Sequence, residues 1–430
     1  ETMDVEVASP ATISRNGMVY FDPRIMGYQH LLDKFLQCGF PPDITDSDKL
    51  SAKEMIDFLL PPLLRVTRNQ CRQVSPIQDQ NMIHSFSALL ATHLAQYHTN
   101  AHRHEDSEGI GVVAALDCYI LFSSIWSLGV ACETNSRATF GQHVRRLVYG
   151  QAESPRKIQP AFPDRGSVFD YCFDLQRRRW VAWMDTVDKQ IIPDSCPAEK
   201  IIIQTIDNVR SQYILGHCIR HNIKLLFCGP TGSGKTVYMH EGLMQLPKQS
   251  HTQIFAGFSA QTKCTQTQSM IDGRLERRRR GTYGPPSGKL CVVLVDDLNM
   301  PAKEHFGAQP PIELLRQGMD SLAYPPSGGW YDCNDSTHPF RTIIDVLFTA
   351  CMGLPGGGRT FLSPRILGLM YLVGFPLVDE GSMVLIFGTI LDSKHRAEDY
   401  PADVSGISRR LVLATLEIYR KISSELLPTP

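Results

Sequence analysis

The sequence has almost no excess charge of either sign, and this excludes several classes of function. Its 430 residues carry 43 Lys and Arg against 44 Asp and Glu, a formal net charge of −1. Proteins that bind nucleic acid or anionic membranes electrostatically need a basic excess, so we expect neither nucleic acid nor a membrane as a partner. With 43% hydrophobic residues, the chain is long enough for two to four globular units with buried cores.

Cysteine pairs, membrane-spanning runs and targeting signals are missing as well. The 12 cysteines form no Cys-x-x-Cys pair and have no histidine partners at metal spacing, so we expect reduced thiols in a cytosolic protein. The most apolar run, residues 118–132, is too short to span a bilayer and predicts a buried helix. The sequence begins without an initiator methionine or a signal peptide, and we expect it to be part of a longer polypeptide.

Hydrophobic spacing divides the first half of the chain into three stretches. Residues 1–25 have β-branched and turn residues in strand-like order, whereas residues 26–149 have apolar residues at helical spacing. Pro61 and Pro62 should break or kink one of these helices. Residues 150–195 lack a clear period and contain many turn residues, which is typical of a connecting segment.

The second half alternates between strand-like and helical runs over residues 196–376 and then returns to helical spacing over 377–430. Such alternation predicts an α/β unit with a mainly parallel sheet. Inside this unit lies the loop GPTGSGKT, residues 229–236, which follows an apolar run and precedes a helical one. It matches the phosphate-binding pattern G-x-x-x-x-G-K-[ST].

The residue types of this loop suit phosphate binding. Glycines let successive backbone N–H groups point at phosphate oxygens, Lys235 would neutralise charge on the β and γ phosphates, and the Thr236 hydroxyl would bind Mg²⁺. An ordinary glycine-rich turn is the alternative. We predict nucleotide contacts from the whole loop, namely Gly229, Pro230, Thr231, Gly232, Ser233, Gly234, Lys235 and Thr236.

Two aspartates follow the apolar run CVVLV, where the second half of such a site belongs. Asp296 would hold Mg²⁺ through water, and Asp297 would orient the water that attacks the γ-phosphate. Two aspartates that cap a helix after a strand are the alternative interpretation. Together with the glycine-rich loop, they predict that the chain binds ATP or GTP with Mg²⁺.

These motifs belong to a longer pattern that resembles the third AAA+ module of dynein heavy chains. The pattern includes VVLVDDLNMPAKEHFGAQPPIELLRQGMD at residues 292–320, ACMGLPGGGR at 350–359 and FSAQTKCTQTQSMIDGRLERRRRGTYGPPSGK at 258–289. The opening, VASPATISRNGMVYFDP at 7–23, resembles the end of the second module's large subdomain. DFLLPPLLRVTRNQC, which begins at Asp57, resembles that module's helical small subdomain.

The resemblance implies a fold and its subdivision. The fold would be an α/β P-loop AAA+ core, with a mainly parallel sheet and helices on both faces, flanked by all-α small subdomains. The implied units are the end of the second module's large subdomain, its helical small subdomain, a connection, the third module's large subdomain and the start of its small subdomain. Their ranges are 1–25, 26–149, 150–195, 196–376 and 377–430.

The resemblance also implies a function. The segments DDLNMPAKE and GLPGGGR are similar to axonemal, inner-arm chains, so these residues would form part of an ATP-driven motor ring for minus-end-directed movement on microtubules. The implied cofactors are ATP or ADP and Mg²⁺. Partners would be the other AAA+ modules of the same heavy chain and, through regions outside these residues, intermediate and light chains and microtubules. The implied location is the cytoplasmic cytoskeleton and the axoneme of a cilium or flagellum.

Individual family roles transfer to four further residues. Thr205, Ile206 and Val209 match positions that line the adenine pocket, although the start of a helix packed on the sheet is the alternative for each. Arg15 matches the arginine finger that the second module presents to the ATP of the preceding module. A surface arginine beside a turn is the alternative there.

Three departures from the family pattern leave hydrolysis open. Asp297 stands where a glutamate is usual, Met352-Gly353 where an asparagine often contacts the γ-phosphate, and Gly368 where an arginine is common. Gly353 has no side chain for such a contact. Arg365 is then the only nearby cation in that last segment. We therefore expect regulatory ATP binding with slow or conditional hydrolysis, and the alternative is a nucleotide-binding module that does not hydrolyse.

Two further features remain outside this assignment. The arginine run at 277–280 would suit nucleic-acid or tubulin binding, but the neutral overall charge and the lack of interleaved aromatic residues favour a solvated face. A P-loop helicase or nucleic-acid translocase is a third alternative for the function, and the same two observations and the resemblance to dynein count against it. The loop at 321–333 is longer than is usual in the family, and its sequence indicates no role for it.

Overall fold

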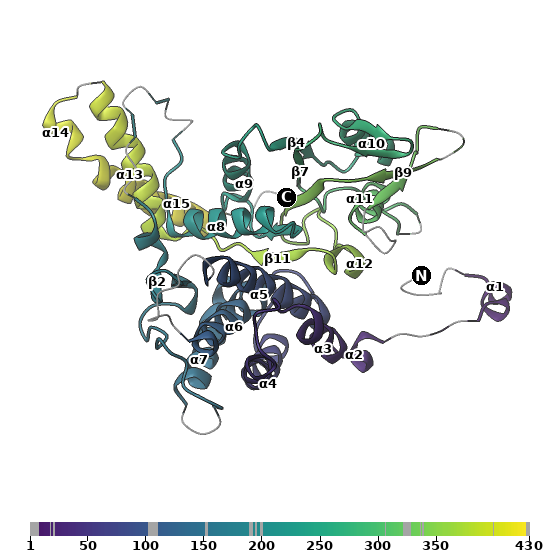
Figure 1. Cartoon of the computed structure of the whole chain (residues 1–430). Coiled ribbons are helices and arrows are strands. Elements are labelled where there is room, and N and C mark those ends of the chain that lie inside the picture. Colours follow the sequence, from purple (N-terminus) through teal and green to yellow (C-terminus); the bar gives the residue numbers. More distant parts are fainter. Residues whose placement is uncertain are drawn as a thin grey trace.

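The computed structural model contains a helical unit, an α/β unit and a C-terminal group of helices (Figure 1). The α/β unit and the helical unit lie against each other, and the last helices project from the edge where α8 and α9 lie. The residues described are 8–17, 19, 22–101, 111–150, 154–188, 192–193, 196–197, 201–305, 307–320, 328–335, 337, 339–398 and 400–426.

A five-stranded sheet forms the centre of the α/β unit. Its strands lie in the order β11-β3-β10-β7-β4, and every neighbouring pair is parallel. The prediction of a mainly parallel sheet is confirmed. The strands are β3 Leu225–Cys228, β4 His251–Gly257, β7 Leu290–Asp296, β10 Val346–Met352 and β11 Tyr371–Gly374.

Helices cover both faces of this sheet. Its strands are apolar at successive positions, so each face presents apolar side chains that must be buried. Along β3, Leu225 and Phe227 belong to one hydrophobic core, and Leu226 and Cys228 belong to another. Side chains that alternate along a strand point to opposite faces, so each face has its own core. The first core includes helices α8 Ile206–Arg220 and α9 Lys235–Met244, and the second includes α10 Cys264–Asp272, α11 Pro310–Met319 and α12 Pro364–Leu367.

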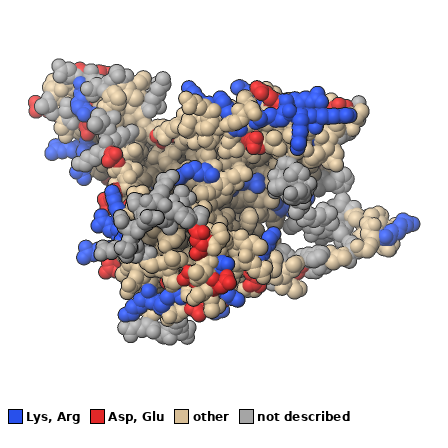
Figure 2. Space-filling view, in the orientation of Figure 1, with Lys and Arg blue, Asp and Glu red and all other residues tan. Residues whose placement is uncertain are grey.

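A second sheet of four strands, ordered β5-β6-β9-β8, extends the α/β unit. The arginine run lies on β5, three of whose four residues are exposed, and Figure 2 shows Lys and Arg side chains gathered where α10 and β9 lie. Residues 321–327 of the long loop fall outside the described residues. Its described end places Trp330 in the core against Phe348. The strands are β5 Glu276–Arg279, β6 Thr282–Gly284, β8 Gly329–Tyr331 and β9 Phe340–Ile343.

Five helices of the described chain, α3 to α7, build the unit that precedes the α/β core. α6 is buried along most of its length, as predicted, and α4 and α5 pack against it. The helical stretch Val112–Ala131 is apolar enough to cross a membrane by composition, but 83% of its most apolar window is buried inside the protein. The helices are α3 Gln29–Cys38, α4 Asp46–Asn69, α5 Asp79–Ala101, α6 Val112–Leu128 and α7 Thr134–Tyr149.

The prolines of this unit do not interrupt their helix. α4 continues from Asp46 to Asn69 with Pro61 and Pro62 inside it, so of the two expected outcomes, a break or a kink, the break is wrong. Two prolines remove backbone donors from the helix. The leucines on either side of them, Leu59, Leu60, Leu63 and Leu64, are all buried in the core, and this packing outweighs the lost hydrogen bonds.

The segment at 150–195 is more ordered than its sequence predicts. Its described part contains a two-stranded antiparallel hairpin, β1 Tyr171–Asp174 with β2 Arg179–Ala182, and two short 3₁₀ helices, η2 Val168–Asp170 and η3 Trp183–Thr186. Aromatic residues anchor it, since the rings of Trp183 and Trp126 lie edge to face at 5.8 Å. Periodicity did not reveal this segment because its strands have only four residues each.

The described N-terminal residues are helical where the sequence indicated a strand. α1 spans Pro10–Arg15, and α2 spans Pro23–Met26. Ser9 caps α1 by accepting a hydrogen bond from the Thr12 amide, and Pro10 suits the first helical position, so local capping explains the difference. Figure 1 shows α1 apart from both units.

The C-terminal residues are helical, as their spacing predicts. The helices are α13 Glu380–Ala397, α14 Ala402–Ser405 and α15 Ser408–Glu425, and α13 packs along α15.

Candidate functional site: a phosphate-binding cavity at the end of the sheet

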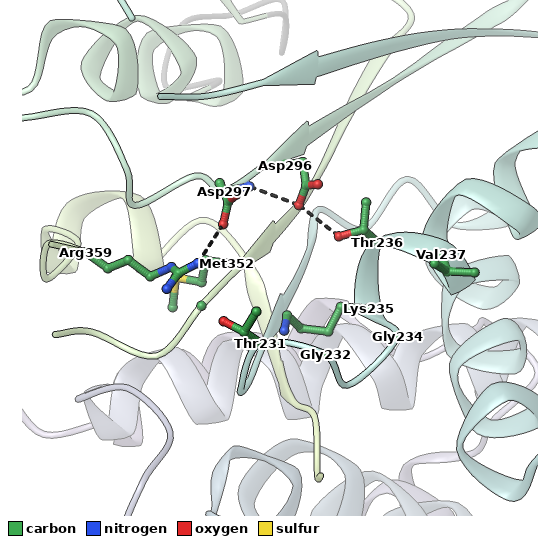
Figure 3. Close-up of a pocket in the computed structure, with 11 residues that line it drawn as sticks. Thr231, Gly232, Gly234, Lys235, Thr236, Val237, Asp296, Asp297, Met352 and Arg359 are labelled. Atoms are coloured by element: carbon green, nitrogen blue, oxygen red, sulfur yellow. Dashed lines mark hydrogen bonds and ion pairs between the residues drawn. The ribbon is translucent and has the colours of Figure 1, made fainter. Parts of the chain in front are cut away.

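A cavity of about 260 Å³ lies where three strands of the large sheet end at the same edge. The loop after β3 carries the glycine-rich sequence, the loop after β7 carries the two aspartates, and the loop after β10 lies between them in the sheet order. Parallel strands direct their carboxyl ends to one edge, and ligands bind there in open α/β folds. The lining residues are Thr231, Gly232, Gly234, Lys235, Thr236, Val237, Asp296, Asp297, Met352, Gly353 and Arg359 (Figure 3).

The glycine-rich loop has the backbone shape that its sequence predicts. Gly232 and Gly234 have φ values of +80° and +85°, a region that residues with a Cβ rarely adopt. A Cβ on Gly229 would come within 2.5 Å of the Phe375 carbonyl oxygen, so only glycine lets β3 turn beside β11. α9 then begins at Lys235, with its N-terminus at the cavity. The positive end of the helix dipole thus faces any anion bound there.

Lys235 is positioned by the loop itself. Its ammonium donates to the carbonyl oxygens of Gly229 at 2.9 Å and Pro230 at 2.5 Å, and to the Ser233 hydroxyl at 3.2 Å. Burial lowers the pKa of this ammonium, and the positive charge of Arg359 adds to the lowering. The negative charge of bound phosphates would oppose this lowering of the pKa, because it favours the protonated form. Gly229, Pro230 and Ser233 therefore support Lys235 without lining the cavity.

The two predicted Mg²⁺ ligands meet although they come from different loops. The Thr236 hydroxyl donates to Asp296 Oδ1 at 3.0 Å, and the Asp297 amide donates to the same oxygen at 3.0 Å. Among the described residues no group of three His, Cys, Asp or Glu side chains could hold a metal alone. A hydroxyl beside a carboxylate suits Mg²⁺, which completes its octahedron with waters and nucleotide phosphates. These residues fit the cofactor.

Asp297 occupies a strained position immediately after β7. Its φ of +52° lies in the left-handed region, which aspartate tolerates better than most side chains. Its carboxylate is 43% exposed, and Oδ1 lies 3.6 Å from the Arg359 guanidinium. The structure thus places Asp297 in the cavity and gives it a partner that the sequence analysis did not single out.

The predicted adenine contacts lie outside the cavity lining. Thr205 is buried as the N-cap of α8, where its hydroxyl accepts from the Asn208 amide, and Val209 is buried in a hydrophobic core. Ile206 packs against the same core from a partly buried position. The helix-start alternative therefore describes the positions of all three, and contact with a base stays a prediction.

Two predicted or discussed cations also lie elsewhere. Arg15 is exposed in the last turn of α1, away from the cavity. This position agrees with a role at another module's site but does not test it. Arg365 lies on α12 and pairs with Glu313 at 3.5 Å, and Gly368 ends that helix.

The residue that sequence reasoning missed is Arg359. It belongs to the quoted segment GLPGGGR, and the signal was a single cation after three glycines in the loop that follows a central strand. Val237 also lines the cavity, and its apolar side chain gave no signal for a phosphate site. Met352 and Gly353 lie in the lining as well, at the position where the family pattern often has a γ-phosphate contact.

A parallel five-stranded sheet, a phosphate-binding loop and an aspartate pair on a nearby strand define the chain as an AAA+ P-loop protein. Two family models match it. The "P-loop containing dynein motor region" matches residues 190–377, and the "Dynein heavy chain AAA lid domain" matches residues 52–185, which includes the β1–β2 hairpin.

The similar proteins are axonemal dynein heavy chains. Dynein axonemal heavy chain 12 of Rattus norvegicus is 34% identical over 440 residues, which cover 100% of this chain and 14% of that protein. Dynein axonemal heavy chain 3 of Homo sapiens is 34% identical, with 100% of this chain and 10% of that protein covered. This chain therefore belongs to the dynein heavy chain family and corresponds to part of the motor region. It spans about a seventh of the length of the first of these relatives.

Proposed function

We propose that this chain contributes the third AAA+ module of an axonemal, inner-arm dynein motor ring, and that it binds ATP or ADP with Mg²⁺ to regulate minus-end-directed movement on microtubules. The observation that carries the nucleotide proposal is the contact between Thr236 and Asp296 at 3.0 Å. It brings the end of the phosphate-binding loop next to the end of β7, so that one Mg²⁺ ion and one nucleoside triphosphate would contact both segments.

The same cavity supports slow or conditional hydrolysis. Thr231, Gly232, Gly234, Lys235 and Thr236 would hold the phosphates, and Asp296 with Thr236 would hold the metal, which supplies positive charge to the β and γ phosphates. Asp297 is the residue that would orient water. Its side chain is about one methylene shorter than glutamate, and a displacement of about 1 Å can lower a rate about a hundredfold. Its pairing with Arg359 restrains it further.

A module that binds nucleotide without hydrolysing it is the second candidate, favoured by Gly353. This residue follows β10 directly and has no side chain that could contact a γ-phosphate. The two candidates share every binding residue. They differ in whether Asp297 acts on water.

The wider assignments rest on the similar proteins. Their names place them in the axoneme, and we extend this location, in a cilium or flagellum, to the present chain. The proposed partners are the other AAA+ modules of the same heavy chain, with intermediate and light chains and microtubules bound by other regions. Arg15 would serve the site of the preceding module in such a ring.

Nucleotide binding is tested in the intact heavy chain by hydrogen exchange read at peptides that cover residues 229–236. Titration with ADP or ATP should slow exchange of these amides in the wild type, because loop N–H groups would bind phosphate. Lys235→Ala should abolish the effect. If the wild-type loop shows no protection at saturating nucleotide, or if Lys235→Ala keeps full protection, the binding proposal fails.

Hydrolysis requires a separate experiment. Single-turnover hydrolysis at this site should be detectable in the wild type and should fall by about a hundredfold or more in Asp297→Asn. Equal rates in the two proteins, with unchanged motor regulation, would remove the catalytic role of Asp297 and leave the non-hydrolysing candidate.

A further inference from the structure

The Arg359 guanidinium lies in the phosphate cavity with part of its hydrogen-bonding capacity unused. It lines the cavity together with Lys235 and Thr231, and it is 26% exposed. Its Nε atom is buried and has no hydrogen-bond partner in the part of the chain that the structure describes. Its one ion pair within the described residues, to Asp297, is long at 3.6 Å (Figure 3). A guanidinium offers five donors in a planar fork, and because Nε is enclosed by protein atoms, the capacity open to an anion is that of the two terminal nitrogens.

The loop that carries Arg359 is built to hold it at this place. Gly356, Gly357 and Gly358 all have positive φ, and Gly356 and Arg359 exchange two backbone hydrogen bonds at 3.0 and 3.1 Å. The residue after them is fixed as well, because the Thr360 amide donates to the Asn299 carbonyl at 3.0 Å. A closed turn of this kind limits how far the arginine backbone can move.

Gly353 provides the space that the arginine side chain occupies. A Cβ built on Gly353 would lie 2.4 Å from Arg359 Nε and 2.6 Å from its Cδ, distances that no side chain tolerates. The Gly353 carbonyl is held in turn by the buried Asn299 side chain at 3.0 Å. The glycine at the end of β10 and the arginine six residues later are therefore complementary. Gly353 has no side chain, and the cationic side chain of Arg359 occupies the space beside it.

We infer that Arg359 contacts the terminal phosphate of a bound nucleoside triphosphate and exchanges Asp297 for that phosphate when the triphosphate binds. This inference rests on the proposed nucleotide binding and identifies how the site would distinguish a triphosphate from a diphosphate. A phosphate group carries more negative charge than a carboxylate and matches the guanidinium fork with two parallel hydrogen bonds, so it is the stronger partner.

The exchange has a consequence for Asp297. While Arg359 pairs with it, the carboxylate is held toward the β10 loop. When the terminal phosphate takes the guanidinium, the Asp297 carboxylate is released to accept a hydrogen bond from water. The arginine would thus link recognition of the third phosphate to the availability of the proposed base.

The test compares two nucleotides in the intact heavy chain, with hydrogen exchange of the peptides over residues 229–236 as the readout. In Arg359→Ala, the affinity for a non-hydrolysable ATP analogue should fall by about 10- to 100-fold, the range for hydrogen bonds to charged groups. The affinity for ADP should stay within about twofold, because ADP lacks the phosphate that Arg359 contacts. Gly353→Ala should give the same pattern, since its methyl group displaces the guanidinium while the arginine remains.

The control variant is Arg280→Ala, which removes an exposed arginine from outside the cavity and should change neither affinity. Equal losses for ADP and the triphosphate analogue in Arg359→Ala, or no loss for either, would overturn the inference. The proposed nucleotide binding would still hold after either of these results, provided that nucleotide protects the wild-type loop and that Lys235→Ala abolishes this protection. If no nucleotide protects the wild-type loop, both the proposed nucleotide binding and the inference on Arg359 fail.

Discussion

The buried ion pair between Asp117 and Arg156 makes a sharp prediction about the segment that sequence analysis assigned to a connection. Arg156 donates from Nε to Asp117 Oδ2 at 2.7 Å and from Nη2 to Asp117 Oδ1 at 2.6 Å. It also donates to the Ser51 carbonyl oxygen at 2.7 Å. Asp117 lies on α6 and is 2% exposed, so Arg156→Ala would leave a buried carboxylate without its cation.

The expected loss is about 3 kcal/mol in the free energy of unfolding at neutral pH, near the lower end of the range for a broken buried pair. The lower end applies because Arg156 is itself 24% exposed, so water can reach the vacated position. The double variant Asp117→Asn, Arg156→Ala should recover part of the loss, because an amide has no charge to leave unpaired. Arg177→Ala is the matched control, since its pair with Asp174 is long and half-exposed, and it should change stability by less than about 0.5 kcal/mol.

The loss should also depend on pH in a defined direction. Burial raises the pKa of Asp117 above its ordinary value, and the hydrogen bonds from Arg156 oppose the rise. A carboxyl with a raised folded-state pKa favours the folded state below its unfolded pKa, and this contribution is lost as pH rises through the folded pKa. Without Arg156 the pKa rises further, so the deficit of Arg156→Ala should be full at neutral pH and should shrink as acid protonates Asp117.

Urea unfolding followed by tryptophan fluorescence suits this measurement. Three of the chain's four tryptophans, Trp126, Trp180 and Trp183, lie in the helical unit or in the hairpin packed on it, so the signal reports this part of the chain. Comparison of wild type and Arg156→Ala at neutral and mildly acidic pH gives both the loss in the free energy of unfolding and the change of that loss with pH. A deficit below about 0.5 kcal/mol, or one that does not change with pH, would refute the reasoning.

Two further predictions concern the cavity and the second sheet. Asp297→Asn should raise the affinity for a non-hydrolysable ATP analogue about fivefold and leave ADP affinity unchanged, because it frees Arg359 from a half-exposed pair worth about 1 kcal/mol. Weaker analogue binding in the same exchange titration would contradict this. Trp330→Ala should destabilise the four-stranded sheet by about 3 to 5 kcal/mol, because the ring is completely buried over Gly318. Amide hydrogen exchange in peptides over residues 328–343 should become much faster. An unchanged exchange rate there would show that Trp330 does not stabilise this sheet.

The parts of the fold that the sequence predicted are those with strong local patterns. β3, β7 and β10 are largely apolar runs of four to seven residues at the centre of a sheet, and α6 is rich in apolar residues and buried along most of its length. The hairpin of β1 and β2 was not predicted, because its strands are short and its stability comes from aromatic contacts with α6 that are distant in sequence. The helix that continues through Pro61 escaped prediction for a similar reason, since burial of the flanking leucines decides it.

The candidate site divides in the same way between local and long-range determinants. Lys235, Thr236 and Asp296 were predictable because a contiguous motif fixes each of them relative to its own strand. Arg359 was not, because its position depends on β10 lying between β3 and β7 and on the missing side chain of Gly353. From sequence alone Gly353 indicated a lost phosphate contact. In the folded chain the same glycine leaves the space that the Arg359 side chain occupies, so a charged group from six residues later lies in the cavity at this place.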